Sequence, residues 1–245
     1  MGGSTLSAVL RSSVFALLQL LLTPPYAMIA LATFPLSPQT RYRIISGWAR
    51  FFVVVARAVC GVRYRVLGRA HIPHEPCVFL AKHQSAWETL AFQAILPPHA
   101  MVIKRELLWI PFFGWGLALM SPIAIDRSAR RRALKQVLEQ GKARLAAGFS
   151  VMIYPEGTRM PPGRRGRYRT GGAWLAVHSG VPVVPIAHNA GFVWPRNSFL
   201  KRPGLVTVSI GTPIATEGRE PDAVTEQASA WIEAECDRLG DARHA

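Results

Sequence analysis

After residue 62 the sequence alternates short apolar runs with helical patterns, and this alternation constrains the fold more than any other feature. The apolar runs predict strands at Tyr64 to Leu67, Cys77 to Ala81, Met101 to Ile103, Pro122 to Ile125, Val151 to Tyr154, Val183 to Ala187 and Leu205 to Ile210. The helical patterns cover Ala86 to Ile95, Arg127 to Ala147, Gly172 to His178 and Pro221 to Leu239. The alternation predicts an α/β domain with a mixed, largely parallel sheet flanked by helices.

The first 62 residues have a different, strongly apolar character. No charge lies between Arg11 and Arg41, and the stretch from Val14 to Phe34 is long enough to cross a bilayer, which needs about 20 apolar residues. Pro24 and Pro25 interrupt this stretch, so we expect a break or a sharp kink that leaves two shorter apolar pieces.

A second apolar segment runs from Ile44 to Val62. Arg50 and Arg57 are seven residues apart in it, which places both on one helical face, with aromatic and aliphatic side chains elsewhere around the helix. This arrangement is typical of a helix that lies in the lipid interface.

The charge balance is strongly basic, with 29 Lys and Arg against 14 Asp and Glu and a formal net charge of +15. Such an excess indicates an anionic partner, either nucleic acid, a membrane surface or a phosphorylated substrate. No acidic residue occurs from Met1 to His74, so the basicity is concentrated outside the C-terminal part. Nucleic acid is disfavoured because the arginines alternate with membrane-grade apolar segments rather than with stacking aromatics.

These features predict two regions, residues 1–62 as membrane-anchoring helices and residues 63–245 as the α/β domain. The basic flank favours a cytoplasmic face, so the expected location is the inner membrane with the active site facing the cytoplasm. A signal peptide is the alternative, since Ala30-Leu31-Ala32 resembles a cleavage site. The three cysteines have no metal-ligand spacing, which suits thiols in a reducing compartment.

One short motif, His83 followed five positions later by Glu88, lies where a predicted strand passes into a predicted helix. Side chains at strand ends point into a cleft on a rigid scaffold, so His83 is a candidate general base that Glu88 orients. A structural alternative is a capping box, in which Ser85 caps the helix and Glu88 reaches back to it.

A second cluster, Tyr154 to Arg159, follows the next strong strand pattern. Pro155 and Gly157 stop the strand, so we expect the Glu156 carboxylate and the Arg159 guanidinium to face a cleft. An arginine presents a planar fork that suits phosphate. A structural Glu-Arg pair at a loop is the alternative.

Four ordered blocks together resemble the glycerolipid acyltransferases, and among them the bacterial 1-acylglycerol-3-phosphate acyltransferases. The blocks are His83 to Glu88, Ile123 to Arg127, Tyr154 to Arg159 and Val181 to Ile186. Two positions depart from the usual family pattern. Glu88 stands where most members have Asp, and Tyr154 stands where Phe is more usual.

The resemblance implies that His83 activates the acceptor hydroxyl with Glu88 as its partner. The resemblance also assigns acceptor binding to the third block, Tyr154 to Arg159, and to the basic residues Arg127 and Lys104. The expected substrate-binding residues are Glu156, Gly157, Thr158, Arg159, Arg127 and Lys104.

The resemblance also implies that no cofactor is needed, because an acyl-CoA or acyl-carrier protein would be the donor substrate and direct transfer would need no acyl-enzyme. His178 and His188 lack the spacing of zinc ligands, so no metal site is expected. The predicted partners are the lysophospholipid acceptor, the donor and the membrane. Two alternatives remain, an acyltransferase for another lysolipid such as a lyso-ornithine lipid and a non-catalytic basic protein that binds membranes.

Overall fold

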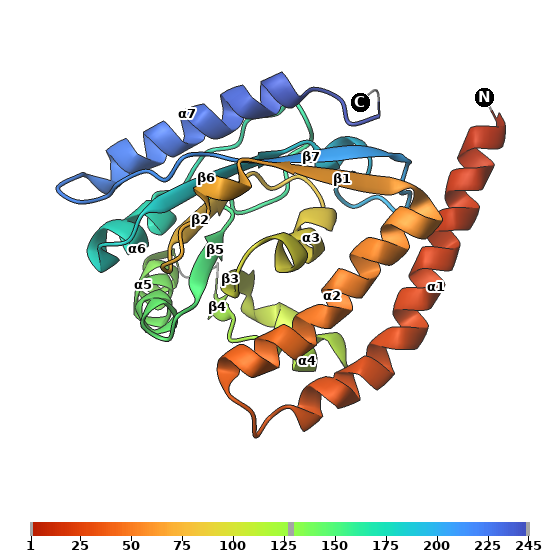
Figure 1. The fold of residues 1–245 in the computed structure, drawn as a ribbon, viewed down its shortest axis with the longest axis horizontal. Coiled ribbons are helices and arrows are strands. Elements are labelled where there is room, and N and C mark those ends of the chain that lie inside the picture. The colour runs from red at the N-terminus through yellow and green to blue at the C-terminus, as the bar shows by residue number, and fades with distance from the viewer. Residues whose placement is uncertain (1, 127–129, 244–245) are drawn as a thin grey trace.

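A mixed sheet runs through the centre of the molecule, and helices cover both of its faces (Figure 1). The computed structural model describes residues 2–126 and 130–243. The strands are β1 Val62–Leu67, β2 Val78–Ala81, β3 His99–Lys104, β4 Ile123–Ile125, β5 Ser150–Ile153, β6 Val183–His188 and β7 Gly204–Ile210. The α-helices are α1 Gly2–Ala32, α2 Pro38–Cys60, α3 Trp87–Ile95, α4 Phe113–Leu119, α5 Arg130–Ala146, α6 Gly171–Ser179 and α7 Pro221–Leu239, and the 3₁₀ helices are η1 Arg69–His71, η2 Arg105–Trp109 and η3 Ala190–Phe192.

The strand order is β1-β7-β6-β2-β5-β3-β4. Neighbouring strands pair in parallel except β6 and β7, which pair antiparallel, so the predicted mixed, largely parallel sheet is confirmed. Each predicted strand has a counterpart in this sheet within a few residues. The helix predicted from Arg127 to Ala147 corresponds to α5, and its predicted first residue, Arg127, lies outside the described residues.

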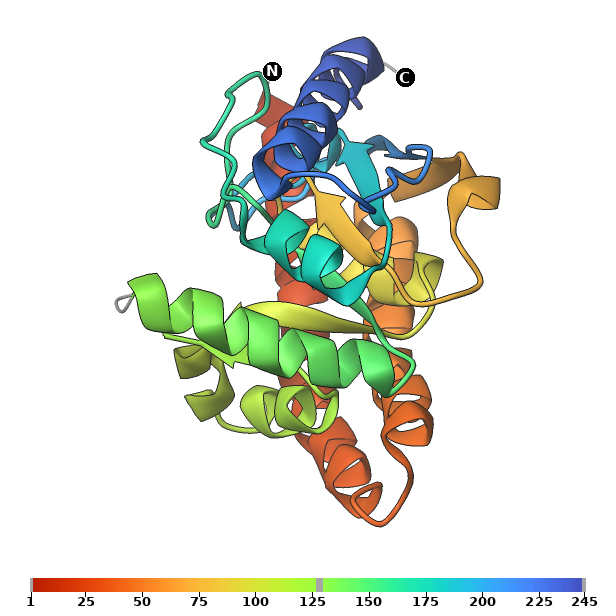
Figure 2. The same cartoon turned by 90° about the vertical axis from the view of Figure 1, so that its left-hand side faces the viewer.

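The alternation of side chains along β2 separates two cores. Phe79 and Ala81 belong to the core under α2 and α3, whereas Val78 and Leu80 belong to the core under α5, α6 and α7. Figure 2 shows these last three helices covering their face of the sheet. Because side chains alternate along an extended chain, Lys82 and His83 leave the end of β2 toward opposite faces.

Helix α1 continues through Pro24 and Pro25, so the expected division into two apolar pieces is wrong. A proline pair removes backbone hydrogen bonds, but the helix is held by packing on both sides of the pair. Phe15 is buried before it, and Ala27 and Ala30 are buried after it. The helix changes direction along its length instead of breaking (Figure 1).

Helix α2 packs against the sheet layer rather than standing apart from it. Ser37 caps its start by accepting a hydrogen bond from the Thr40 backbone, and Gly61 ends it with a φ of 70°. Phe52 and Ala56 share one core cluster with Phe79 of β2. The aromatic side of α2 therefore faces partly into the protein, and residues 1–62 and 63–245 bury their apolar side chains together.

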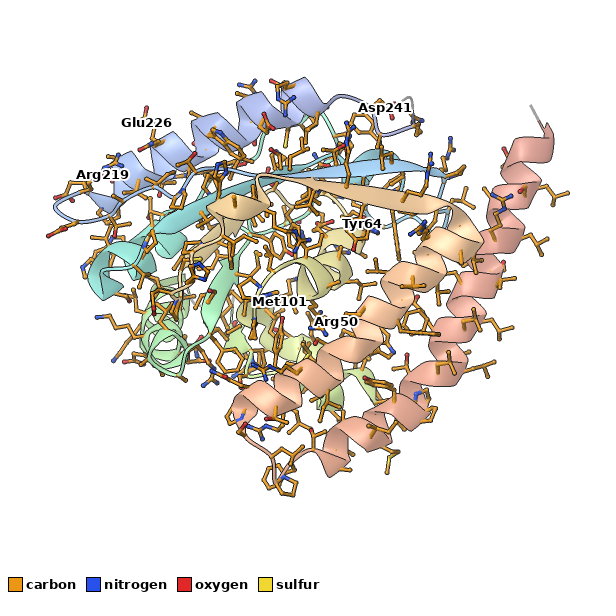
Figure 3. All side chains as sticks on the ribbon, viewed as in Figure 1. Arg50, Tyr64, Met101, Arg219, Glu226 and Asp241 are labelled. Carbon is orange, nitrogen blue, oxygen red and sulfur yellow. The ribbon has the colours of Figure 1, made fainter. Side chains whose placement is uncertain are left out.

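Helix α4 fills the angle between the two N-terminal helices. A Cβ at Gly116 would lie 3.8 Å from Ala30 of α1 and 3.9 Å from Ile45 of α2, which are ordinary packing distances, so α4 lies close to both helices. By length and composition, Thr5–Ala32 of α1 could cross a membrane. Leucine and isoleucine side chains on α1 project away from the rest of the protein (Figure 3).

Candidate active site

His83 lies in the short segment between β2 and α3, and its ring bonds to a carboxylate of α3. The distance from His83 Nδ1 to Glu88 Oε1 is 2.8 Å. An ionised carboxylate only accepts hydrogen bonds, so Nδ1 carries the proton and Nε2 keeps its lone pair. The residue lines a cavity, so a group bound there can reach the ring.

Glu88 makes the contacts that both sequence alternatives require. Its Oε1 accepts hydrogen bonds from the backbone N–H of Ser85 at 2.9 Å and of Gln84 at 3.0 Å, in addition to the His83 ring. Ser85 Oγ in turn accepts from the Trp87 backbone at 3.0 Å. The helix start and the imidazole are therefore fixed by the same carboxylate oxygen.

The Glu88 side chain is fully buried, yet it stays ionised. Burial opposes its ionisation, but the nearby imidazoles of His188 and His83, together with the hydrogen bonds from His83 and Ser85, hold the pKa of Glu88 below its usual value. The ionised Glu88 carboxylate is therefore the acceptor that holds the Nδ1–H of the His83 ring.

The other face of the His83 ring stacks on Tyr154 at the end of β5. The ring centroids are 4.1 Å apart and the planes differ by 21°. Together with the Glu88 bond, this contact fixes the imidazole plane. Burial raises the pKa of Tyr154 well above its usual value, so its hydroxyl keeps its proton.

The cavity beside His83 has a volume of about 410 Å³ and a lining of two chemical kinds. One kind is apolar and comes from the N-terminal helices, α4 and β3, including Ala27, Ala30, Ile45, Trp48, Met101, Phe113, Leu117 and Met120. The other kind is polar and cationic, and includes His83, Lys104, Thr158, Arg159, Arg196 and Asn197. Met101 lies between the sheet and α2 (Figure 3). A ligand with an anionic head and an apolar tail matches both kinds.

The cations of this lining lack protein counter-ions. Among the described residues, no carboxylate forms an ion pair with Lys104, Arg159 or Arg196. Three positive side chains around one cavity attract an anionic group, and such donors form charge-assisted hydrogen bonds with phosphate or carboxylate. Arg127, the remaining predicted phosphate ligand, lies outside the described residues.

Glu156 does not face the cavity, so the expectation that it faces a cleft beside Arg159 is wrong. Its carboxylate is buried, and it bonds to Lys82 Nζ at 2.8 Å and to the His83 backbone N–H at 3.1 Å. It also accepts a bond from the Gly166 backbone at 3.1 Å. The buried Lys82 ammonium attracts the carboxylate inward, and Glu156 thereby supports the backbone of His83.

Gly157 and Thr158 form the turn between Glu156 and Arg159. Gly157 has a φ of 68°, which favours glycine, and the Arg169 guanidinium lies 3.6 Å from where a Cβ would be. Thr158 is exposed and lines the cavity next to Arg159. The turn thus brings Thr158 and Arg159 to the same cavity as His83 and Lys104.

The sequence reasoning missed the residues that support the site from the opposite face of the sheet. Lys82 bonds to Glu233 of α7 at 2.7 Å as well as to Glu156, and the Tyr168 hydroxyl donates to Glu233 at 2.8 Å. Strand alternation could have shown that Lys82 points away from the His83 face. Arg196 gave no signal, because it lies in a loop outside the four sequence blocks.

His188, which we considered as a metal ligand, has a structural role instead. Its Nε2 donates to the Lys82 backbone carbonyl at 2.9 Å, and its Nδ1 accepts from the Ala190 backbone at 3.3 Å. Burial lowers the pKa of His188, although the nearby Glu88 carboxylate acts in the opposite direction. Within residues 2–126 and 130–243, no group of three or more His, Cys, Asp or Glu side chains is arranged to hold a metal.

Comparison with known proteins identifies the family of this chain. Residues 63–189 match the family model described as Acyltransferase. The chain is 45% identical over 234 residues to a 1-acyl-sn-glycerol-3-phosphate acyltransferase of Pseudomonas aeruginosa, and the match covers 94% of this chain and 91% of that protein. It is 30% identical over 223 residues to the human 1-acyl-sn-glycerol-3-phosphate acyltransferase alpha, covering 77% of each chain.

The fold also matches a solved structure. The crystal structure of the 1-acyl-sn-glycerophosphate acyltransferase from Thermotoga maritima superposes with a TM-score of 0.80 at 20% identity, covering 96% of this chain and 97% of that one. The chain therefore belongs to the acyltransferase family. The resemblance seen in the four sequence blocks, to the 1-acylglycerol-3-phosphate acyltransferases of bacteria, is confirmed by the Pseudomonas relative.

The buried Lys82 cluster leads to a prediction on stability. Lys82→Met leaves the carboxylates of Glu156 and Glu233 without their shared cation, and we expect it to lower the free energy of unfolding by about 3–5 kcal/mol. Lys135→Met is the control, because the Lys135 pair with Glu139 is exposed and contributes below about 1 kcal/mol. Urea denaturation of both variants checks this, and equal midpoints would contradict it.

Proposed function

We propose that the chain transfers a fatty acyl group from a thioester donor to the free hydroxyl of 1-acylglycerol-3-phosphate, giving phosphatidic acid. The hydroxyl oxygen bonds to the thioester carbonyl carbon as His83 Nε2 removes the hydroxyl proton. The carbon–sulfur bond then breaks, and the protonated imidazole returns the proton to the leaving thiolate. No acyl-enzyme forms, and the acyl group moves once.

The observation that carries this proposal is the 2.8 Å bond from His83 Nδ1 to Glu88, beside a cavity with three unpaired cations. The bond supports a general base, since it fixes the tautomer whose Nε2 can accept a proton. As the positive charge forms on the ring, the buried Glu88 carboxylate stabilises it.

The two kinds of cavity lining suggest how the acceptor binds. The phosphate lies against Lys104 and Arg159, which supply charge-assisted hydrogen bonds. The apolar lining from α1, α2 and α4 receives an acyl chain. This arrangement favours a phosphate-bearing acceptor over a lyso-ornithine lipid, which lacks the phosphate that these cations would bind.

The exposed apolar surface suggests membrane binding through the N-terminal part. Side chains on α1, η2 and α4 are apolar and exposed, including Leu6, Leu10, Leu20, Leu21, Met28, Ile29, Trp109, Ile110 and Trp115. A surface of this kind marks a membrane interaction. Phe15 and Ala30, in different halves of α1, both pack on the rest of the protein, so α1 is proposed to lie along the lipid interface.

The membrane proposal extends to location and donor. Water-soluble thioesters, acyl-CoA or an acyl-carrier protein, reach the site from the aqueous side, while the acceptor comes from the lipid. A cytoplasmic face of the inner membrane supplies both. The strongly basic charge supports this orientation through attraction to anionic lipid.

The function is tested by acyl transfer from a thioester to 1-acylglycerol-3-phosphate in detergent micelles. Wild-type protein should form phosphatidic acid, and His83→Ala should lower kcat by about 10²–10⁴-fold, the usual contribution of a general base. His178→Ala is the control, since His178 is stacked on Trp174 far along α6. Transfer at the wild-type rate in His83→Ala would exclude the catalytic role of His83.

A second prediction separates the two charged residues of the third block. Arg159→Ala should raise the acceptor KM by about 10–100-fold, because a hydrogen bond to a charged group contributes about 1.5–3 kcal/mol. Glu156→Gln should lower thermal stability while changing this KM little, because its carboxylate contacts Lys82 and the His83 backbone. Equal increases in KM for both variants would mean that Glu156 contacts the acceptor.

A further inference from the structure

We propose that Arg196 is a second guanidinium that binds the acceptor phosphate and makes the enzyme select phosphate-bearing acceptors. The inference rests on the proposed function and assigns a residue outside the four sequence blocks to the same site. Arg196 belongs to the loop that joins η3 to β7, and its side chain lines the cavity together with His83, Lys104 and Arg159.

The first supporting observation is a direct link between the two arginine segments. Arg196 Nη1 donates a hydrogen bond to the backbone carbonyl of Arg159 at 2.6 Å. The two residues are 37 positions apart in the sequence, so the bond ties the turn after β5 to the loop before β7. One phosphate with several oxygens can then meet a guanidinium from each segment.

The second observation is that the Arg196 loop is rigidly held. Lys201 is buried, and its ammonium lies over the rings of Phe15, Trp194 and Phe199 at 5.1, 4.6 and 5.4 Å. The Lys201 backbone N–H also donates to Ser12 Oγ of α1 at 2.9 Å. Cation–π contacts with a desolvated ammonium are strong, so this aromatic cage fixes the loop to α1.

The loop also shows local strain beside Arg196. Asn197 has a φ of 54°, a conformation that non-glycine residues rarely adopt, and it lines the cavity as well. Such backbone conformations persist where the surroundings determine them. The cage at Lys201 supplies these surroundings, so Arg196 is presented to the cavity by a preorganised turn.

The third observation is charge. From Gly157 to Thr216 the sequence has no Asp or Glu, although this stretch holds Arg159 and Arg196. Arg165, by contrast, pairs with Asp237 at 2.7 Å. Within the described residues Arg196 has no carboxylate partner, so its charge remains available to an anion at the cavity.

The consequence concerns selectivity. A neutral acceptor with the same acyl chain fills the apolar lining but gives the cations nothing to bind. Removing one phosphate ligand should therefore weaken binding of 1-acylglycerol-3-phosphate and leave 1-acylglycerol unaffected. The loss of one charge-assisted hydrogen bond corresponds to about a tenfold change in affinity.

The experiment compares wild type, Arg196→Gln, Arg196→Lys and the control Arg202→Gln with both acceptors. Arg202 is exposed in the same loop and does not line the cavity. We expect Arg196→Gln to raise KM for 1-acylglycerol-3-phosphate about tenfold with little change in kcat, and to leave KM for 1-acylglycerol unchanged. Arg196→Lys should recover part of the loss, and Arg202→Gln should match wild type.

Two results would overturn the inference, a wild-type KM in Arg196→Gln or an equal loss for both acceptors. Binding of glycerol 3-phosphate can be measured as the shift that it causes in the thermal unfolding midpoint, and this readout does not depend on turnover. The shift should be smaller in Arg196→Gln than in Arg202→Gln, and equal shifts would also contradict it. If wild type binds glycerol 3-phosphate through Arg196 but transfers no acyl group, the proposed function fails and the phosphate site stands.

Discussion

The site depends on one carboxylate oxygen that accepts three hydrogen bonds. Glu88 Oε1 accepts from the His83 ring and from two backbone N–H groups at the start of α3. The backbone bonds anchor the helix start and hold the carboxylate in place, so the imidazole meets an acceptor that is already oriented. The same carboxylate oxygen thus anchors the helix start and bonds to the imidazole, so the capping contact does not compete with the proposed catalytic one.

A second set of contacts holds the same histidine from the opposite side of the sheet. Lys82 joins Glu156 and Glu233 beneath the strand ends, and the other Glu156 oxygen accepts the His83 backbone N–H. Alternation at the end of β2 makes this possible, since neighbouring residues project to opposite faces. The His83 side of the sheet is thus supported by a buried charge cluster under α7.

The fold was largely predictable from the sequence because its strands are short, apolar and separated by clear helical patterns. The position of His83 at a strand end followed from the same pattern. Glu156 was misplaced because burial of a carboxylate depends on Lys82 and Glu233, which are 74 and 77 residues away along the chain and gave no local signal.

The N-terminal helices show a similar limit. Apolar composition predicted their existence, but it could not show that Phe52 packs in the same core as the sheet. Nor could local rules show that α1 continues through Pro24 and Pro25, since the packing that holds it comes from residues distant in sequence. Arg196 reaches the cavity through tertiary contacts of its loop, so only the structure reveals it.

The central claim is that Glu88 fixes the tautomer of His83 and leaves Nε2 ready to accept a proton. Nitrogen-15 NMR of histidine-labelled protein, with the His83 signals assigned by their loss in His83→Gln, measures this directly. The account predicts a protonated Nδ1 and an unprotonated Nε2 for neutral His83 in wild type, with a mixture of tautomers in Glu88→Ala. A neutral His83 protonated at Nε2 in the wild-type protein would contradict it.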